Sequence, residues 1–147
     1  MPRYEASVEV ARPVEEVFYY MNDVGREREW QPHLIEAEQI PPGLPGVGTR
    51  RRYTSEFLGK RVENTYVVRL YEENTRVVLE ATEDSSVRST TDVRWERIAS
   101  GTRVTMAVEG EPAGALKLIP DALAEKAFGK EVDEALERVK EILERSA

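Results

Sequence analysis

The stretch from Pro112 to Ala147 constrains the fold more than any other part of the chain. Its apolar residues recur at intervals of three or four and the opposite face is almost entirely charged; the apolar set is Leu116, Ile119, Leu123, Ala127, Phe128, Val132, Leu136, Val139, Ile142 and Leu143. This spacing predicts one apolar stripe on an α-helix. A helix from Pro120 to Arg145 is about 39 Å long at 1.5 Å per residue, against an expected radius of gyration of about 15 Å. Such a helix must lie across the body of the domain, so the rest of the chain has to supply the surface that receives it.

Length and charge narrow the class of protein. The 147 residues predict one domain, residues 1–147, with a single core. The net charge of −7 argues against nucleic acid as a partner. The absence of cysteine excludes disulfides and thiolate sites. Without an apolar signal segment at Met1 to Glu5 or a run as long as a membrane span, we expect a cytoplasmic protein with no stable membrane insertion, either a monomer or a homodimer.

The first third of the chain predicts one strand and two short helical segments. Residues Arg3 to Val10 alternate between apolar and polar, as a half-buried strand does. Pro13 suits the first turn of a helix, and the two glutamates that follow it favour the positive end of the helix dipole. Val24 to Leu34 predicts a second short helix or an irregular turn.

Strands with short polar breaks follow, interrupted once by a Pro- and Gly-rich loop at residues 41–48. Short breaks favour antiparallel hairpins over helical crossovers. The predicted strands are Ile35–Ile40, Thr49–Leu58, Arg61–Tyr71, Arg76–Thr82, Val87–Ile98 and Thr102–Gly110. One sheet of this size buries a face only if something covers it, and the C-terminal helix is the only segment large enough. The sequence therefore predicts an α+β fold in which a curved antiparallel sheet of about six or seven strands wraps around the long C-terminal helix, with two short helices after the first strand.

Several motifs along this layout resemble the START/SRPBCC superfamily, and in particular the bacterial polyketide cyclase/dehydrase and lipid-transport family. The matching residues are Val8–Val10, Ala11–Phe18, Asp23, Trp30-Gln31-Pro32, Gly48-Thr49, Gly101–Thr105 and the ending Leu136–Glu144. The resemblance covers essentially the whole chain. It implies a helix-grip fold with an apolar cavity between sheet and helix, in a family whose members bind lipids, sterols, polyketides and other hydrophobic molecules, and of which a minority are enzymes. A shared fold does not transfer a function.

Alternation along the strands predicts an inner face that mixes apolar and polar residues. A one-residue slip in register would reverse this assignment. The residues placed inward are Tyr53, Ser55, Phe57, Asn64, Tyr66, Val68, Leu70, Val77, Leu79, Ser89, Thr91, Val93, Trp95, Val104, Met106 and Val108. Apolar walls with a few polar anchors are typical of a small-molecule pocket. The alternative is that the polar members lie near the sheet ends, where they meet water or bond to neighbouring backbone.

The binding hypothesis divides these residues by role. Trp30 and His33 flank Pro32 near the expected opening, and Ser55 lies on the same face as its aromatic neighbours. Asn64, Ser89 and Thr91 would orient the polar end of a ligand. Apolar contact would come from Tyr53, Phe57, Tyr66, Trp95, Met106, Leu123 and Phe128.

No catalytic residue, metal site or cofactor is predicted. His33 is the only histidine, and no second member of an acid–base pair accompanies it. One histidine and no cysteine leave only carboxylates as possible metal ligands, and no calcium loop is present. The glycines of residues 41–48 match neither the dinucleotide nor the P-loop pattern. Arg51 faces away from Arg50 and Arg52, so it either enters the cavity mouth to pair with an acidic ligand group or belongs to a solvated strand edge.

Three functions remain open at this point. The first is a binding or transport module for a hydrophobic small molecule such as a lipid or polyketide. The second is a polyketide aromatase or cyclase that folds a reactive chain in the same pocket by positioning it. The third is a protein-interaction or stress-response role without a ligand, which an exposed apolar patch around Leu44 and Val47, or on the last helix, would favour.

Overall fold

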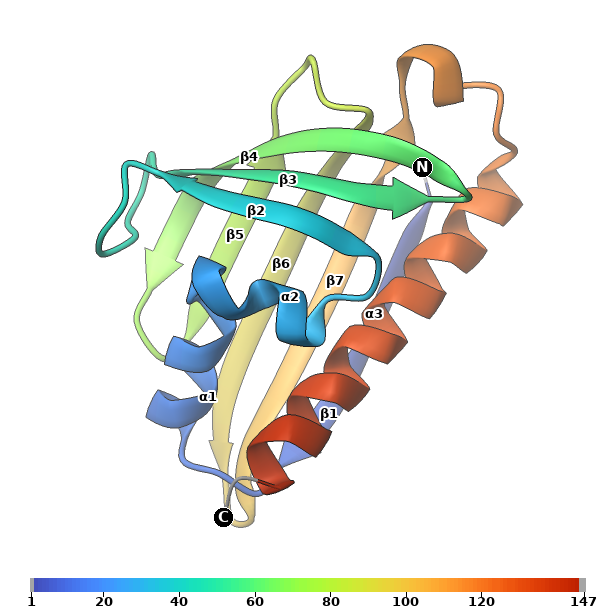
Figure 1. Ribbon diagram of the computed structural model, residues 1–147. Helices are drawn as coiled ribbons and strands as arrows, with labels where there is room; N and C mark the ends of the chain where they lie inside the picture. Colours follow the sequence, from blue (N-terminus) through green and yellow to red (C-terminus); the bar gives the residue numbers. More distant parts are fainter. Residues whose placement is uncertain (1, 146–147) are drawn as a thin grey trace.

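The computed structural model describes residues 2–145 and has one seven-stranded antiparallel sheet that curves around a long helix (Figure 1). The strand order is β1-β7-β6-β5-β4-β3-β2, so only β1 pairs out of sequence order, with β7. The strands are β1 (Arg3–Val10), β2 (Leu34–Ile40), β3 (Arg50–Phe57), β4 (Lys60–Glu72), β5 (Arg76–Ala81), β6 (Val87–Ile98) and β7 (Gly101–Pro112). The predicted sheet and its covering helix are confirmed.

Two short helical segments follow β1, as the sequence predicts. Helix α1 (Val14–Met21) begins directly after Pro13, and a 3₁₀ turn (Val24–Arg26) leads into the single turn of α2 (Glu27–Trp30). The Asp23 carboxylate accepts a hydrogen bond from the backbone N–H of Gly25 at 3.0 Å, which caps the 3₁₀ turn. These segments lie at the open side of the curved sheet and place α2 against both β2 and the long helix.

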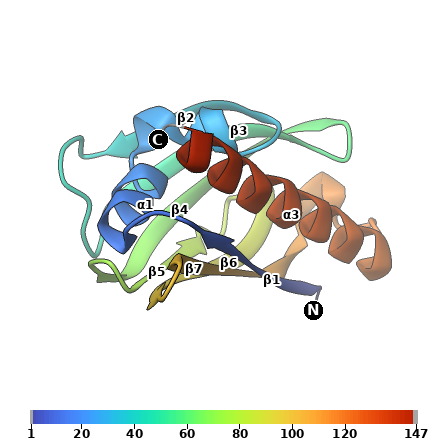
Figure 2. The same cartoon turned by 90° about the horizontal axis from the view of Figure 1, so that it is seen from below.

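The long helix α3 (Asp121–Arg145) crosses the concave face of the sheet (Figure 2). Pro120 comes immediately before it, and the Pro120 carbonyl accepts hydrogen bonds from the N–H groups of Leu123 and Ala124. The proline therefore begins the helix instead of kinking it. A second 3₁₀ turn (Gly114–Leu116) connects β7 to this start. Within residues 2–145, no helix is both long and apolar enough to span a membrane.

The buried stripe of α3 differs from the prediction at its N-terminal end. Leu123 was expected inside, but it is 44% exposed, whereas Ala124 is buried. Counting back four residues from Phe128 reaches Ala124, so the 3.6-residue period turns Leu123 away from the sheet. Gly129 is also buried, and the ring of Tyr4 packs against it so closely that an added Cβ would lie 3.2 Å from the ring. The Tyr4 hydroxyl then donates to Asp133 at 2.8 Å, which fixes β1 along the helix.

The predicted register of β4 is wrong beyond a bulge in this strand. The pairing with β5 shifts between Val68 and Leu70. Leu70 was expected to face the core; instead Tyr71 packs against it, with its ring 5.6 Å from that of Phe18. Strict alternation fails because a bulge adds one residue to one strand only.

Gly110 on β7 lets the strand pass close to β6. A Cβ at this position would lie 2.3 Å from the carbonyl oxygen of Arg88 and 2.5 Å from the Cα of Ser89. Both obstacles are backbone atoms, so no side-chain rotation relieves the contact. The glycine thereby allows β7 to lie this close to β6 beside Ser89.

We therefore predict that Gly110→Ala destabilises the protein by about 3 kcal/mol, as overpacking does. The urea unfolding midpoint measures this loss. Gly46→Ala is the matched control, because an added Cβ there meets nothing within 4 Å and should change stability by less than about 0.5 kcal/mol. An unchanged midpoint for Gly110→Ala would mean that β6 and β7 separate without cost.

Candidate functional site

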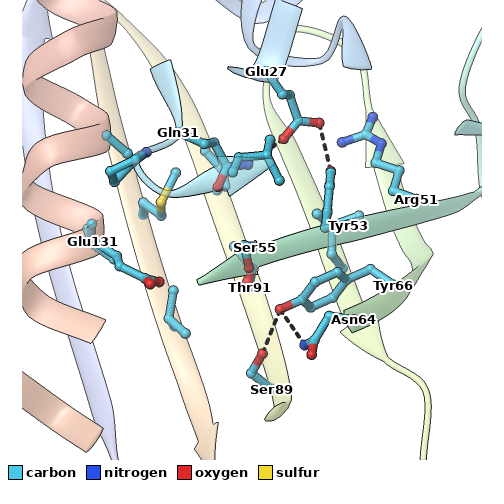
Figure 3. A pocket seen from close by; sticks show the side chains of 18 of the residues that line it. Glu27, Gln31, Arg51, Tyr53, Ser55, Asn64, Tyr66, Ser89, Thr91 and Glu131 are labelled. Atoms are coloured by element: carbon cyan, nitrogen blue, oxygen red, sulfur yellow. Dashed lines mark hydrogen bonds between the residues drawn. The ribbon is translucent and has the colours of Figure 1, made fainter. Parts of the chain in front are cut away.

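A cavity of about 150 Å³ lies between the concave face of the sheet, α2 and α3 (Figure 3). Apolar side chains from five strands and α3 form most of its wall: Phe57, Val62, Val77, Leu79, Val93, Met106, Val108, Phe128, Val132 and Ala135. An apolar cavity of about this volume holds a molecule the size of benzene. The space is smaller than the roughly 300–1,000 Å³ of pockets for drug-sized ligands.

A buried carboxyl group, Glu27, lies at one side of the cavity where α2 meets β3. Its side chain is 2% exposed and accepts a hydrogen bond from the Tyr53 hydroxyl at 2.7 Å. The Gln31 amide donates to its other carboxylate oxygen. Burial raises the pKa of Glu27, while the charge of Arg51 and the two hydrogen bonds oppose that rise. A single-turn helix thus presents a polar group to the cavity that its neighbours hold in one position.

Arg51 is also buried, at 2% exposed, and lies in the cavity wall, which is the first of the two positions left open by the sequence. One terminal nitrogen donates to the Asn22 side-chain oxygen at 3.2 Å, and Nε is buried without an acceptor. Among residues 2–145 no carboxylate lies within ion-pair distance of this guanidinium; Glu27 acts on it from farther away. The indole N–H groups of Trp30 and Trp95, also on the wall, are buried without acceptors as well.

A second polar group joins β4 to β6. The Asn64 side chain donates to the Val87 carbonyl at 2.6 Å and accepts from the Val87 N–H at 3.0 Å. It also donates to the Tyr66 hydroxyl, which shares a 2.9 Å hydrogen bond with Ser89. Asn64 therefore takes the place of a backbone partner where β5 has ended, which is the backbone-bonding alternative left open by the sequence. Ser55 and Thr91 make no side-chain hydrogen bond to the described residues, so their hydroxyls remain open to the cavity.

Glu131 is the one carboxylate that α3 directs into the cavity (Figure 3). Burial, and to a smaller extent the charge of Glu134, raise its pKa from 4.5 to about 7. Among residues 2–145 it has no hydrogen-bond or ion-pair partner. An ionisable group on the buried stripe between Phe128 and Val132 is thus left uncompensated in an apolar wall.

Eleven of the thirteen side chains predicted to contact a ligand line this cavity; the exceptions are His33 and Leu123. His33 is exposed in the turn before β2, with φ of 63°, and its backbone carbonyl accepts from the N–H of Glu56. His33 therefore forms part of the turn before β2 and does not line the cavity. Leu123 lies on the outer side of α3, as described above. The role of the other eleven in binding a ligand stays a prediction.

The sequence reasoning missed the acidic members of the wall. Glu131 could have been found, because it lies three residues after Phe128 and four before Ala135, on the predicted apolar stripe of α3. Glu27 and Gln31 had no such signal, since α2 is only one turn long. The described residues contain no group of three side chains arranged to hold a metal ion.

Glu131 generates a pH-dependent prediction for stability. Between its usual pKa of 4.5 and the folded value of about 7, the unfolded chain releases a proton that the folded protein keeps, so stability falls as pH rises. At about 1.4 kcal/mol per pH unit, the loss is up to about 3 kcal/mol. Glu131→Gln should remove this loss and unfold at higher urea concentration than the wild type at pH about 8.

The control is Glu125→Gln, which removes the same charge from an exposed position of α3 and should leave the pH profile of stability unchanged. Urea unfolding at several pH values between about 4.5 and 8 provides the comparison. A Glu131→Gln profile parallel to that of the wild type would contradict the burial of this carboxyl group.

Comparisons with known proteins agree on the fold. A START superfamily protein from Mycobacterium smegmatis is 15% identical, with a TM-score of 0.83 over 99% of each chain. A protein from Thermus thermophilus is 19% identical, with a TM-score of 0.74 over 99% of this chain and 100% of the other. A protein from Mesorhizobium loti is 18% identical, with a TM-score of 0.73 over 99% and 98%. At these identities the likeness is one of fold.

The sequence comparison identifies the family. No curated protein sequence matches this chain. The profile of the family described as polyketide cyclase/dehydrase and lipid transport matches residues 1–144. Family and fold together indicate a role in binding hydrophobic ligands. The resemblance inferred from the sequence motifs is confirmed, and the chain belongs to the polyketide cyclase/dehydrase and lipid-transport family, with a START-like helix-grip fold.

Proposed function

We propose that this protein binds a small hydrophobic molecule in the cavity between the sheet and α3 and that binding, not catalysis, is its main activity. The observation that carries the proposal is the mixed wall of that cavity. Its surface is mostly aliphatic and aromatic, yet it includes the Ser55 and Thr91 hydroxyls and the Glu131 carboxylate, whose side chains make no hydrogen bond to another described residue. An unpartnered buried polar group costs about 1–3 kcal/mol, and a ligand that bonds to it recovers part of this cost.

The size of the cavity limits the ligand. A volume of about 150 Å³ accepts one aromatic or alicyclic ring with a short substituent. A long acyl chain or a multi-ring polyketide requires α2 to move away from α3, against which it packs. The proposal accordingly favours a compact ligand, carried by a cytoplasmic monomer or homodimer that has no nucleic-acid partner.

A catalytic role is the second candidate, because Glu131 supplies an acid–base group that the sequence reasoning did not identify. A carboxyl group with a pKa of about 7 exchanges protons near neutral pH. On this alternative, Glu131→Gln abolishes conversion of the bound molecule and leaves its binding intact. On the binding proposal, the extracted molecule is recovered unchanged after incubation with the protein.

Native mass spectrometry of freshly purified protein, followed by organic extraction, tests the binding proposal directly. We expect a stoichiometric adduct whose chemical class then defines the next ligands to examine. A bare mass that stays unchanged with a panel of small aromatic and alicyclic compounds would contradict the proposal. It would favour an interaction role, for which Leu44, Val47 and Leu118 are the most exposed large apolar residues of the described chain.

A pair of substitutions on β6 tests the location of the site. Thr91 lines the cavity, whereas its neighbour Thr90 is exposed on the other face. Thr91→Phe should fill the cavity and weaken binding of phenethyl alcohol, a small neutral probe, by about tenfold or more, whereas Thr90→Phe should leave it within about twofold. Saturable thermal stabilisation by the probe measures both. Equal weakening, or none, would place the binding site elsewhere.

A further inference from the structure

The carboxylate of Glu131 is the least compensated charge in the cavity. It extends from α3 toward the space enclosed by the sheet, as Figure 3 shows. No hydrogen bond or ion pair connects it to another described residue. Because the neighbouring positions on this face of the helix are Phe128, Val132 and Ala135, no polar side chain of α3 solvates it from within the cavity. A partly buried carboxylate without a partner is costly unless a cation or proton joins it.

The other charged groups of the wall do not supply that cation. Arg51 and Glu27 lie together on the opposite side of the cavity in Figure 3. The charge of Arg51 acts on Glu27, lowering its pKa against the effect of burial. The charge that acts on Glu131 is that of another acid, Glu134. The positive charge of the wall is thus paired electrostatically with Glu27 and leaves Glu131 without a counter-ion.

Aromatic rings line the same cavity as this carboxylate. Tyr53 and Tyr66 lie with ring centroids 5.7 Å apart and both line the cavity, as do Trp30 and Trp95. Aromatic faces attract ammonium groups, and the attraction strengthens where water is excluded. An unpaired carboxylate in an aromatic-lined cavity therefore has the chemistry that recognises an organic cation. A carboxylate ligand would meet the two acids Glu131 and Glu27, and only Arg51 on the far side of the cavity could bind it.

We propose that the small molecule bound in this cavity carries an amine, bound as its ammonium ion, and that the Glu131 carboxylate is its counter-ion. The inference rests on the proposed function and names the chemical class of its ligand. A primary or secondary amine on a single aromatic or alicyclic ring fits the volume of about 150 Å³. The ammonium donates hydrogen bonds to Glu131, while the ring contacts the apolar wall.

Three probes of similar size separate this inference from the proposed function: phenethylamine, phenethyl alcohol and phenylacetate. We expect phenethylamine to bind at least about tenfold more tightly than the alcohol at pH about 8, and phenylacetate to bind most weakly. Calorimetric titration gives the three affinities. If none of the probes binds, the proposed function fails as well. If the alcohol binds as tightly as the amine, or phenylacetate more tightly, the cavity binds ligands but the inference is wrong.

Substitution of the carboxylate provides the second readout. Glu131→Gln should reduce the affinity for phenethylamine to that for phenethyl alcohol and leave the alcohol within about twofold. Glu125→Gln, which removes an exposed charge from the same helix, should retain the preference for the amine. If the Glu131→Gln protein kept the full preference for the amine, the ammonium would bind to another group and the inference would be wrong. Binding of the alcohol to the variant demonstrates that its cavity is intact.

The pH dependence of binding is the third readout. Ammonium binding requires the ionised carboxylate, so affinity for phenethylamine should rise about tenfold from pH about 6 to about 8, following the ionised fraction of a group with a pKa of about 7. Affinity for the alcohol should stay constant. A flat profile for the amine would overturn the inference. Glu134 on α3 and Tyr66 on β4 interact electrostatically with Glu131; the other charged or titratable groups of the cavity wall are Glu27 on α2 and Arg51 and Tyr53 on β3, and the cavity-lining residues of β7, Met106 and Val108, are apolar.

Discussion

The packing of α3 against the concave face of the sheet is the interaction on which the rest of the structure depends. Each surface is apolar and each would be exposed to water without the other. The helix meets the sheet most closely at β1, where Gly129 admits the ring of Tyr4 and Asp133 receives its hydroxyl. Farther across the concave face the sheet curves away, so the same helix that closes the core also forms one wall of a cavity.

The polar groups of that cavity differ in whether hydrogen bonds within the protein offset the free-energy cost of burying them. Asn64 is satisfied by the Val87 backbone, and Glu27 accepts from Tyr53 and Gln31. These groups hold strands and helices together whether or not a ligand is present. Glu131 belongs to a different class, because it faces the cavity without a bond to the described chain. Glu131 shares this property with the hydroxyls of Ser55 and Thr91, which also line the cavity without a side-chain hydrogen bond to the described residues.

Sequence periodicity predicted the fold closely and the cavity wall in large part. Alternation placed Tyr53, Asn64 and Ser89 inward because each lies on a strand whose register remains regular up to that point. It failed at Leu70, where a bulge shifts the pairing of β4, and bulges leave no signal in a pattern of period two. Helical periodicity likewise identified Phe128, but Leu123 was wrongly assigned to the apolar stripe: it lies five residues before Phe128 and turns away from the sheet, whereas Ala124 is buried.

The sequence by itself determined an amphipathic helix long enough that it must cross the full width of the domain. It also determined a series of antiparallel hairpins whose apolar face can pack against this helix. These follow from local patterns, which chain connectivity turns into one antiparallel sheet. Only the tertiary structure decided which polar groups bond to each other and which face open space. Arg51 and Glu27 are 24 positions apart in the sequence and Glu131 is farther still, and their common environment arises because three separate elements meet around one cavity. Burial and hydrogen-bond partners set the pKa of such groups, and both depend on how the three elements pack together and not on any one segment alone.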